Sequence, residues 1–162
     1  VFLTLALGAT TARANYDITR SRDLLYDVLY LNPGLVLSGS ALMDSERQVG
    51  FGIGGELSLV YLGRRNPGLF GGLVVDGLYQ FSGQRGRLML GPVIGVSYFG
   101  LDGGYLVELS DKGKTVRHGG AVRLFATIGI VTIYARYNVL ARAADSVEFG
   151  AQLKLPFPVW GR

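Results

Sequence analysis

Single charged residues interrupt several apolar segments, at positions on the polar face of the alternating pattern, and they are the side chains with which this sequence could do chemistry. Six of them stand out: the acids Glu56, Asp76 and Glu148 and the bases Arg123, Arg136 and Lys154. Alternation places them on the polar face of strands, because successive side chains of a strand point to opposite faces. If that face is enclosed, its charges must pair, since an isolated buried charge is costly. We therefore predict a salt-bridge network of these six residues inside a narrow lumen.

Residue types that serve catalysis or metal binding are sparse. The sequence has one histidine, His118, and no cysteine. Gly119-Gly120 follows the histidine, so no adjacent serine is available for it to activate as a nucleophile. Without cysteine there is no thiolate metal site, and the carboxylates are dispersed. Gly52-x-Gly54-Gly55 lies within a strand pattern and is not a dinucleotide fingerprint. We predict no catalytic residue, no metal site and no cofactor, and interpret His118 as an outward-facing interfacial side chain.

The composition is strongly apolar but contains no apolar run long enough for a spanning helix. Hydrophobic residues make up 49% of the 162 residues, mean hydropathy is +0.31, and there are 25 glycines. A spanning helix needs roughly 18 or more consecutive apolar residues. A transmembrane barrel instead spreads its apolarity over every second residue. The length suits one domain, and a net charge of +4 with scattered basic residues argues against a nucleic-acid partner.

The segment Val49–Tyr61 shows the alternation most clearly. Its sequence, VGFGIGGELSLVY, places large apolar residues on one face and glycine, glutamate and serine on the other. An apolar face opposite a small and polar one indicates lipid outside and a packed lumen inside. Similar alternation recurs along the chain. The predicted strands are 35–42, 49–61, 69–81, 87–99, 104–110, 115–127, 130–139 and 147–157.

These segments predict an all-β fold, an eight-stranded antiparallel up-and-down transmembrane β-barrel. The sequence Asn-Pro-Gly-Leu occurs at 32–35 and again at 66–69, and both copies predict a chain reversal. Residues 100–103 predict another turn, and the remaining loops are short. A soluble barrel is the alternative, but its narrow interior would have to hold all the aliphatic and aromatic side chains.

The sequence predicts four parts of the chain. Residues 1–14 resemble the tail of a secretory signal peptide, because an apolar run ends in Ala12-Arg13-Ala14. Residues 15–31 are expected to be a periplasmic segment with a short amphipathic helix, with a strand over 24–31 as the alternative. The transmembrane barrel would occupy 32–157, and 158–162 would be a C-terminal tail.

Aromatic residues gather near the ends of the predicted strands, as the two aromatic girdles of a membrane barrel do. The alternative is the ordinary enrichment of aromatic residues in strands. The residues expected at the periplasmic rim are Tyr61, Tyr98, Tyr105, Phe157 and Trp160. Those expected at the outer rim are Phe51, Tyr79, Phe81 and Tyr137.

The last predicted strand resembles the C-terminal strand of bacterial outer-membrane barrels. It reads Glu148-x-Gly150-x-x-Leu153-x-Leu155, a polar-x-Gly-x-x-hydrophobic-x-hydrophobic pattern, and Phe157 follows. In that class the pattern is a signal that the barrel assembly machinery reads. The chain is most similar in pattern to the small eight-stranded class that includes the OmpA transmembrane domain and OmpX. The extra residues 158–162 depart from it, since these proteins usually end on the aromatic residue.

This resemblance implies a location in the outer membrane of a Gram-negative bacterium. It implies contact with outer-membrane lipid and lipopolysaccharide, help from the assembly machinery during biogenesis, and a monomeric state. Some small barrels of this kind modify lipid A, but the deacylase kind uses a His-x-Ser pair and this chain lacks the serine after His118.

The leading functional hypothesis is a structural barrel with a charge-plugged lumen that supports membrane integrity. The alternative is a small porin-like pore or a transporter of small or hydrophobic solutes. We rank a lipid-modifying enzyme and an adhesin below these, because the triad is incomplete and the loops are short.

Overall fold

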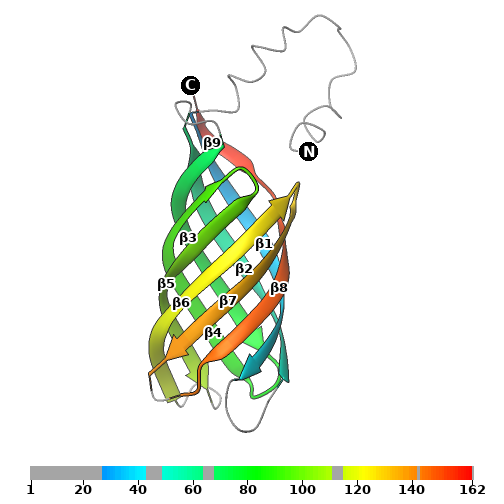
Figure 1. Cartoon of the computed structure of the whole chain (residues 1–162), viewed down its shortest axis with the longest axis vertical. Helices are drawn as coiled ribbons and strands as arrows, with labels where there is room; N and C mark the ends of the chain where they lie inside the picture. The colour runs from blue at the N-terminus through cyan, green and yellow to red at the C-terminus, as the bar shows by residue number, and fades with distance from the viewer. Residues whose placement is uncertain (1–26, 43–48, 64–67, 111–114, 142, 162) are drawn as a thin grey trace, which may run out of the picture.

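The computed structural model describes residues 27–42, 49–63, 68–110, 115–141 and 143–161, and these form a closed antiparallel β-barrel (Figure 1). Eight strands build its wall: β1 (Val28–Leu42), β2 (Val49–Leu62), β3 (Leu69–Gln80), β4 (Arg85–Val96), β5 (Phe99–Ser110), β6 (Thr115–Ile128), β7 (Val131–Leu140) and β8 (Ser146–Lys154). A ninth strand, β9 (Phe157–Gly161), follows β8. The all-β fold predicted from alternation is confirmed.

The barrel closes because β1 pairs with both β2 and β8, while every other wall strand pairs with its neighbours in sequence. Closure leaves the wall no unpaired edge, which is the requirement for a sheet outside water. The described residues contain no helix, and none of them forms a helix long and apolar enough to cross a membrane. The predicted amphipathic helix and signal segment fall largely on residues 1–26, which lie outside the described residues.

The strand connections lie at the two ends of the barrel. The β9 end carries β9, the start of β1 and the connections β2–β3, β4–β5 and β6–β7. The opposite end carries the connections β1–β2, β3–β4, β5–β6 and β7–β8. The predicted loop 43–48 lies outside the described residues, as do 64–67 and 111–114.

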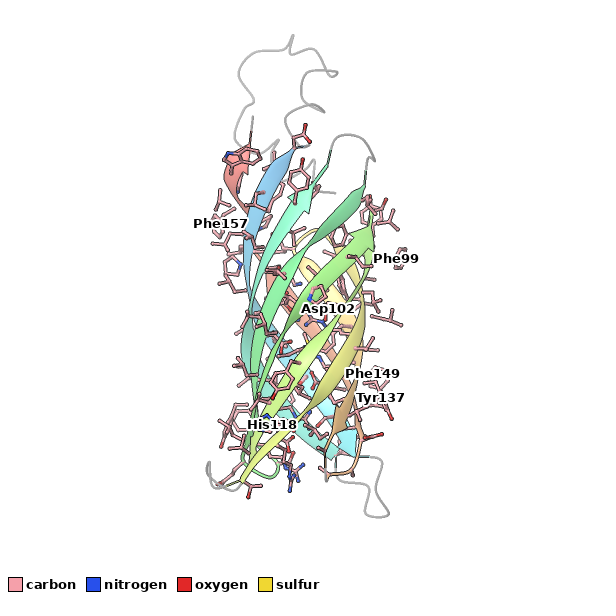
Figure 2. All side chains as sticks on the ribbon, turned by 90° about the vertical axis from the view of Figure 1, so that its left-hand side faces the viewer. Phe99, Asp102, His118, Tyr137, Phe149 and Phe157 are labelled. Carbon is pink, nitrogen blue, oxygen red and sulfur yellow. The ribbon has the colours of Figure 1, made fainter. Side chains whose placement is uncertain are left out.

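Side-chain burial alternates along the strands as the sequence pattern requires. In β2, Phe51, Ile53 and Leu57 are exposed, whereas Glu56 and Ser58 are buried. The large apolar residues therefore cover the outside of the barrel, and small, polar and charged residues fill the inside. Figure 2 shows side chains standing out around the wall.

The first Asn-Pro-Gly sequence is not a turn, contrary to the prediction. Asn32, Pro33 and Gly34 lie within β1, which runs on from Val28. Proline has no N–H to donate and is tolerated where a strand neighbour changes. Pro33 stands where β8 gives way to β9, and its carbonyl oxygen accepts a hydrogen bond from the Leu155 N–H at 3.0 Å. Residues 28–31 are therefore part of a strand. This agrees with the alternative prediction for 24–31 and not with a helix at these residues.

The predicted turn at 100–103 is also wrong. The reversal occurs at Ser97-Tyr98, and β5 begins at Phe99. Ser97 has a positive φ of 53°, and its N–H donates to the Gly68 carbonyl oxygen at 2.6 Å. The glycines of the predicted turn are clearance sites instead, since a Cβ on Gly103 would lie 2.7 Å from the Ala121 carbonyl oxygen.

The C-terminal residues form a strand rather than a tail. β8 ends at Lys154, and after Leu155-Pro156 the chain resumes as β9, which pairs with Val28–Leu31 of β1. The predicted strand 147–157 therefore corresponds to β8 and the first residue of β9. Because β1 extends beyond the end of β8, its first residues offer the free backbone that β9 uses.

Three inward aromatic rings lie over glycines on the neighbouring strand. Phe125 lies opposite Gly100 in register, Phe70 opposite Gly95, and Tyr134 opposite Gly150. A Cβ on each of these glycines would lie 2.2–2.6 Å from the ring. Glycine at these positions thus admits an aromatic ring to a lumen too narrow for two opposed side chains.

Candidate functional site

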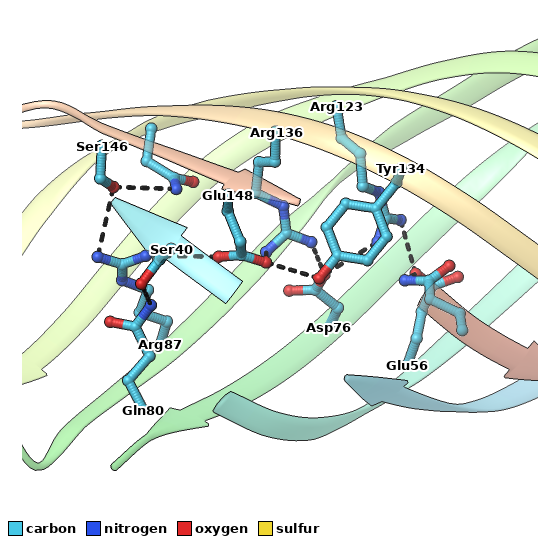
Figure 3. Close-up of polar contacts among 12 residues, drawn as sticks. Ser40, Glu56, Asp76, Gln80, Arg87, Arg123, Tyr134, Arg136, Ser146 and Glu148 are labelled. Atoms are coloured by element: carbon cyan, nitrogen blue, oxygen red, sulfur yellow. Dashed lines mark hydrogen bonds and ion pairs between the residues drawn. The ribbon is translucent and has the colours of Figure 1, made fainter. Parts of the chain in front are cut away.

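The central charged residues of the lumen come from six strands and form a continuous belt. Strand register places Glu56 beside Asp76, and it places Arg123 between Asp102 and Arg136. Arg136 is in turn paired in register with Glu148. In Figure 3, the side chains of Glu56 and Asp76 approach from one side of the lumen, and those labelled Arg123, Arg136 and Glu148 approach from the other. The belt spans the lumen because each position faces inward on its strand.

Arg123 lies at the centre of the belt and contacts three carboxylates. Its Nη2 atom is 2.6 Å from Glu56 Oε2 and 2.6 Å from Asp102 Oδ2, and its Nη1 atom is 3.2 Å from Asp76 Oδ2. The Nε–H also donates to Asp102 at 2.8 Å. The side chain is 0% exposed. A guanidinium offers five donors in a fixed fork, so one arginine can hold several acids.

Arg136 links the same acids to the next part of the lumen. Its guanidinium contacts Asp76, and its Nη1 atom lies 3.7 Å from Glu148 Oε1. The Tyr134 hydroxyl donates to Glu148 at 2.7 Å. The Tyr134 ring also lies within 5.3–5.5 Å of the guanidinium carbons of Arg123 and Arg136, at the distance of a cation–π contact.

Lys154 joins the belt on the side of the β9 end. Its Nζ atom is 2.5 Å from Glu56 Oε1, and it lies 5.3 Å from the centre of the Phe125 ring. Glu56 accepts a further hydrogen bond from Gln152 Nε2 at 2.8 Å. The structure therefore brings all six sequence-predicted residues into one network: Glu56, Asp76, Arg123, Arg136, Glu148 and Lys154.

A second cluster extends the network toward the opposite end. Glu108 lies 2.8 Å from Arg87 Nε, 3.2 Å from Arg117 Nη1 and 4.0 Å from Arg85 Nη1. Arg87 also lies 3.5 Å from Glu148 Oε2, which joins this cluster to the central belt. Here three guanidiniums share one carboxylate, the reverse of the arrangement around Arg123.

Sequence reasoning missed Asp102 and Arg87 as members of the network. The predicted turn at 100–103 includes Asp102, although this residue alternates with Gly100, Gly104 and Leu106 on one face of β5. Arg87 shares its parity with the inward Met89, but it is the first residue of the predicted strand 87–99, where the alternation gives little support. Glu108 and Arg117 do fall on the polar face in the sequence pattern, but their pairing needs the register of β5 with β6.

The lumen contains a cavity of about 270 Å³ between the charged belt and the β9 end. Ser97, Gly129 and Pro156 lie at its mouth, and Glu56, Asp102 and Lys154 form its floor. Its walls are mainly apolar and include Val60, Phe70, Val74, Val93 and Phe125. In Figure 2, Asp102 lies partway along the barrel, between Phe99 and His118.

The residues predicted for the aromatic girdles are exposed on the outside of the barrel, and all but one separate into the two predicted groups, one toward each end. Tyr61, Tyr98, Phe157 and Trp160 are at the β9 end, and Phe51, Tyr79, Phe81 and Tyr137 are toward the opposite end. Tyr105 differs from the prediction, because β5 starts at Phe99 and so places Tyr105 in mid-strand.

His118 lies on the outer wall and contacts this tyrosine. The Tyr105 hydroxyl and His118 Nδ1 are 2.6 Å apart, and the two rings are stacked with centroids 5.8 Å apart. The described residues contain no group of three or more acids or histidines placed to hold a metal ion.

The residues of the predicted C-terminal pattern lie at the end of the wall. Glu148 and Gly150 face inward, Leu153 and Leu155 are exposed, and Phe157 begins β9.

No protein family profile matches this chain, and no curated protein matches it. The chain is similar to a solved structure described as de novo design of transmembrane beta-barrels. The identity is 15%, the match covers 80% of this chain and 97% of that chain, and the TM-score is 0.46.

Proposed function

We propose that this protein is an integral outer-membrane barrel whose lumen is closed by its own charged side chains and whose role is to support the membrane. The observation that carries the proposal is the combination of an apolar exterior with a lumen crossed by ion pairs. A soluble barrel of this size has the reverse arrangement, with apolar residues inside.

The exterior supports a lipid environment. Large apolar side chains are exposed on all eight wall strands, with exposed fractions from 37% at Leu59 to 77% at Val49. Soluble proteins rarely expose contiguous apolar patches of more than a few hundred Å². Wall strands of 9 to 15 residues also match the roughly 9–11 residues that a tilted strand needs to cross a bilayer.

The lumen supports closure rather than transport. Arg123, Arg136 and Glu148 are all buried and lie on a belt that runs from wall to wall. A solute on its way through would have to break several of these contacts, each in a setting of low dielectric constant. This disfavours the porin-like alternative, in which solutes cross the lumen.

The outer-membrane assignment rests on the sequence resemblance to the OmpA and OmpX class. The signal-like residues 1–14 and the pattern from Glu148 to Phe157 support export and assembly by the barrel machinery. In this proposal the β9 end faces the periplasm, and the opposite end faces lipopolysaccharide. We propose that the protein is a monomer. We also propose that it has no enzymatic activity, since His118 has only Tyr105 as a hydrogen-bond partner among the described side chains.

Membrane extraction tests the location. The full chain, expressed with an export signal, is expected to remain in the membrane fraction after carbonate washing and to need detergent for release. It should also migrate differently on gels before and after boiling, as closed membrane barrels do when they stay folded in cold detergent. Recovery in the aqueous fraction without detergent would contradict the proposal.

A further inference from the structure

The two halves of the lumen differ in a way that plugging alone does not require. Toward the opposite end, inward positions combine polar residues, such as Ser40, Gln80 and Asn138, with buried apolar residues, such as Leu78 and Leu140. Toward the β9 end, they include Val60, Phe70 and Phe125, which line the open cavity described above. A plug is complete at the charged belt, so an apolar cavity beyond it calls for a separate explanation.

The cavity walls suit an apolar molecule. Val74 and Val93 are almost fully buried, with exposed fractions of 1% and 4%, and both line the cavity. Small-molecule sites are typically concave and mostly apolar, with a few polar groups that fix orientation. The volume of about 270 Å³ lies near the lower limit for such sites, which restricts the occupant to a small molecule.

Lys154 is the hydrogen-bond donor of the cavity floor. The Lys154 side chain is 16% exposed, and the described residues provide a single carboxylate, Glu56, within ion-pair distance of its Nζ atom. An ammonium group has three donors, so donors remain for a ligand. Among the described residues, Lys154 is the cation that lines the cavity, because Arg123 lies behind Glu56 and Asp102 and is fully buried.

The charges on the floor determine which head group fits. Glu56 and Asp102 balance Lys154 and Arg123, and all four are in ion pairs. An anionic head would add an unbalanced negative charge beside two carboxylates, and a cationic head would compete with Lys154 and Arg123 for them. A neutral oxygen acceptor meets neither penalty.

We propose that this cavity binds a small single-chain amphiphile with an uncharged oxygen head. The chain lies among Val74, Val93 and Phe125, and the oxygen accepts a hydrogen bond from Lys154 Nζ. The molecule enters at the β9 end, between Ser97, Gly129 and Pro156. This function goes beyond the closed barrel proposed above, since the ligand stays on one side of the charged belt and does not cross it.

The test uses the full chain in lipid nanodiscs, with valine methyl groups labelled for NMR. Decanol, decanoate, decylamine and decane are the probes. Decanol is expected to give nuclear Overhauser contacts to the methyl groups of Val74 and Val93, and to bind at least tenfold more tightly than the other three. Equal binding of decane and decanol, or no contact of decanol with these methyl groups, would overturn the proposal.

Two variants with a matched control separate the head from the chain. Lys154→Met is expected to remove the preference for decanol over decane, while Glu56 keeps Arg123 and Gln152 as partners. Val93→Phe should fill the cavity and abolish binding. Ile94→Phe, one residue along on the lipid-facing side of β4, should leave binding unchanged. A Lys154→Met protein that still prefers decanol would refute the assigned donor.

Bilayer conductance tests the closed lumen separately. A failure of ligand binding would therefore leave the proposal of a closed membrane barrel intact.

Discussion

The Nη2 atom of Arg123 lies 2.6 Å from Asp102 Oδ2 and equally close to Glu56 Oε2, so one guanidinium ties β6 to β5 beside it and to β2 across the lumen. Both acids are buried, so their charges depend on partners within the lumen. The arginine therefore acts as a structural counterion for opposite walls of the barrel.

Replacing Arg123 with methionine should strongly destabilise the barrel. The change removes the counterion that Glu56, Asp76 and Asp102 share. Removing one partner of a buried ion pair costs about 3–5 kcal/mol. Urea unfolding and refolding in lipid vesicles measures this free energy. Leu124→Met, on the outward neighbour, keeps an apolar side chain toward lipid and is the control, expected to stay within about 1 kcal/mol. Similar stability of the two variants would show that the belt contributes little.

Gly150→Ala should destabilise the barrel although it adds one methyl group. The new Cβ would lie 2.3 Å from the Leu37 carbonyl oxygen and 2.6 Å from the Tyr134 hydroxyl. Overpacking of this kind typically costs about 1–3 kcal/mol. Gly39→Ala is the control, since its nearest neighbour would be 3.9 Å away. The same unfolding assay compares the two, and an unaffected Gly150→Ala would count against the ring-over-glycine packing.

Trp160 reports whether the outer wall at the β9 end meets lipid. It is the single tryptophan of the chain, and 56% of it is exposed on β9. Aromatic residues of this kind sit at the membrane–water interface. We expect blue-shifted emission after refolding into vesicles and stronger quenching by lipids brominated near the head group than by lipids brominated at the chain end. Emission at the wavelength of water-exposed tryptophan would contradict the girdle.

Arg136→Ala should loosen the closure of the lumen. The variant removes the contacts to Asp76 and Glu148 and shortens a side chain that lies across the belt. We expect either discrete conductance steps in planar bilayers or a clear loss of stability. Ala135→Ser, on the lipid-facing neighbour, is the control for handling of the protein. An Arg136→Ala barrel as stable and as non-conducting as the wild type would exclude Arg136 from the plug.

The positions of the strands and the direction of their side chains were predictable from the sequence, because apolar and polar residues alternate with the two-residue period of a strand. Val49–Tyr61 and Leu69–Phe81 match β2 and β3 to within one residue. The same parity assigned Glu56, Arg123 and Lys154 to one face. The individual partners were not predictable, because they depend on register between strands that are distant in sequence.

Glycine and proline were the residues that sequence reasoning misinterpreted. Gly100 and Gly103 read as a turn, whereas the groups they make room for, the Phe125 ring and the Ala121 carbonyl, lie on the neighbouring strand. This error removed Asp102 from the predicted network. Pro33 likewise read as a reversal, because its tolerance in β1 depends on the break between β8 and β9.

Bilayer conductance of the refolded wild-type protein tests the closed lumen most directly. The belt around Arg123 and Arg136 predicts that the inserted, heat-modifiable barrel gives no steady ion conductance in a planar bilayer. Insertion must be verified on the same sample, so that an absence of conductance can be attributed to a closed lumen. Reproducible open channels from the wild-type barrel would contradict this account.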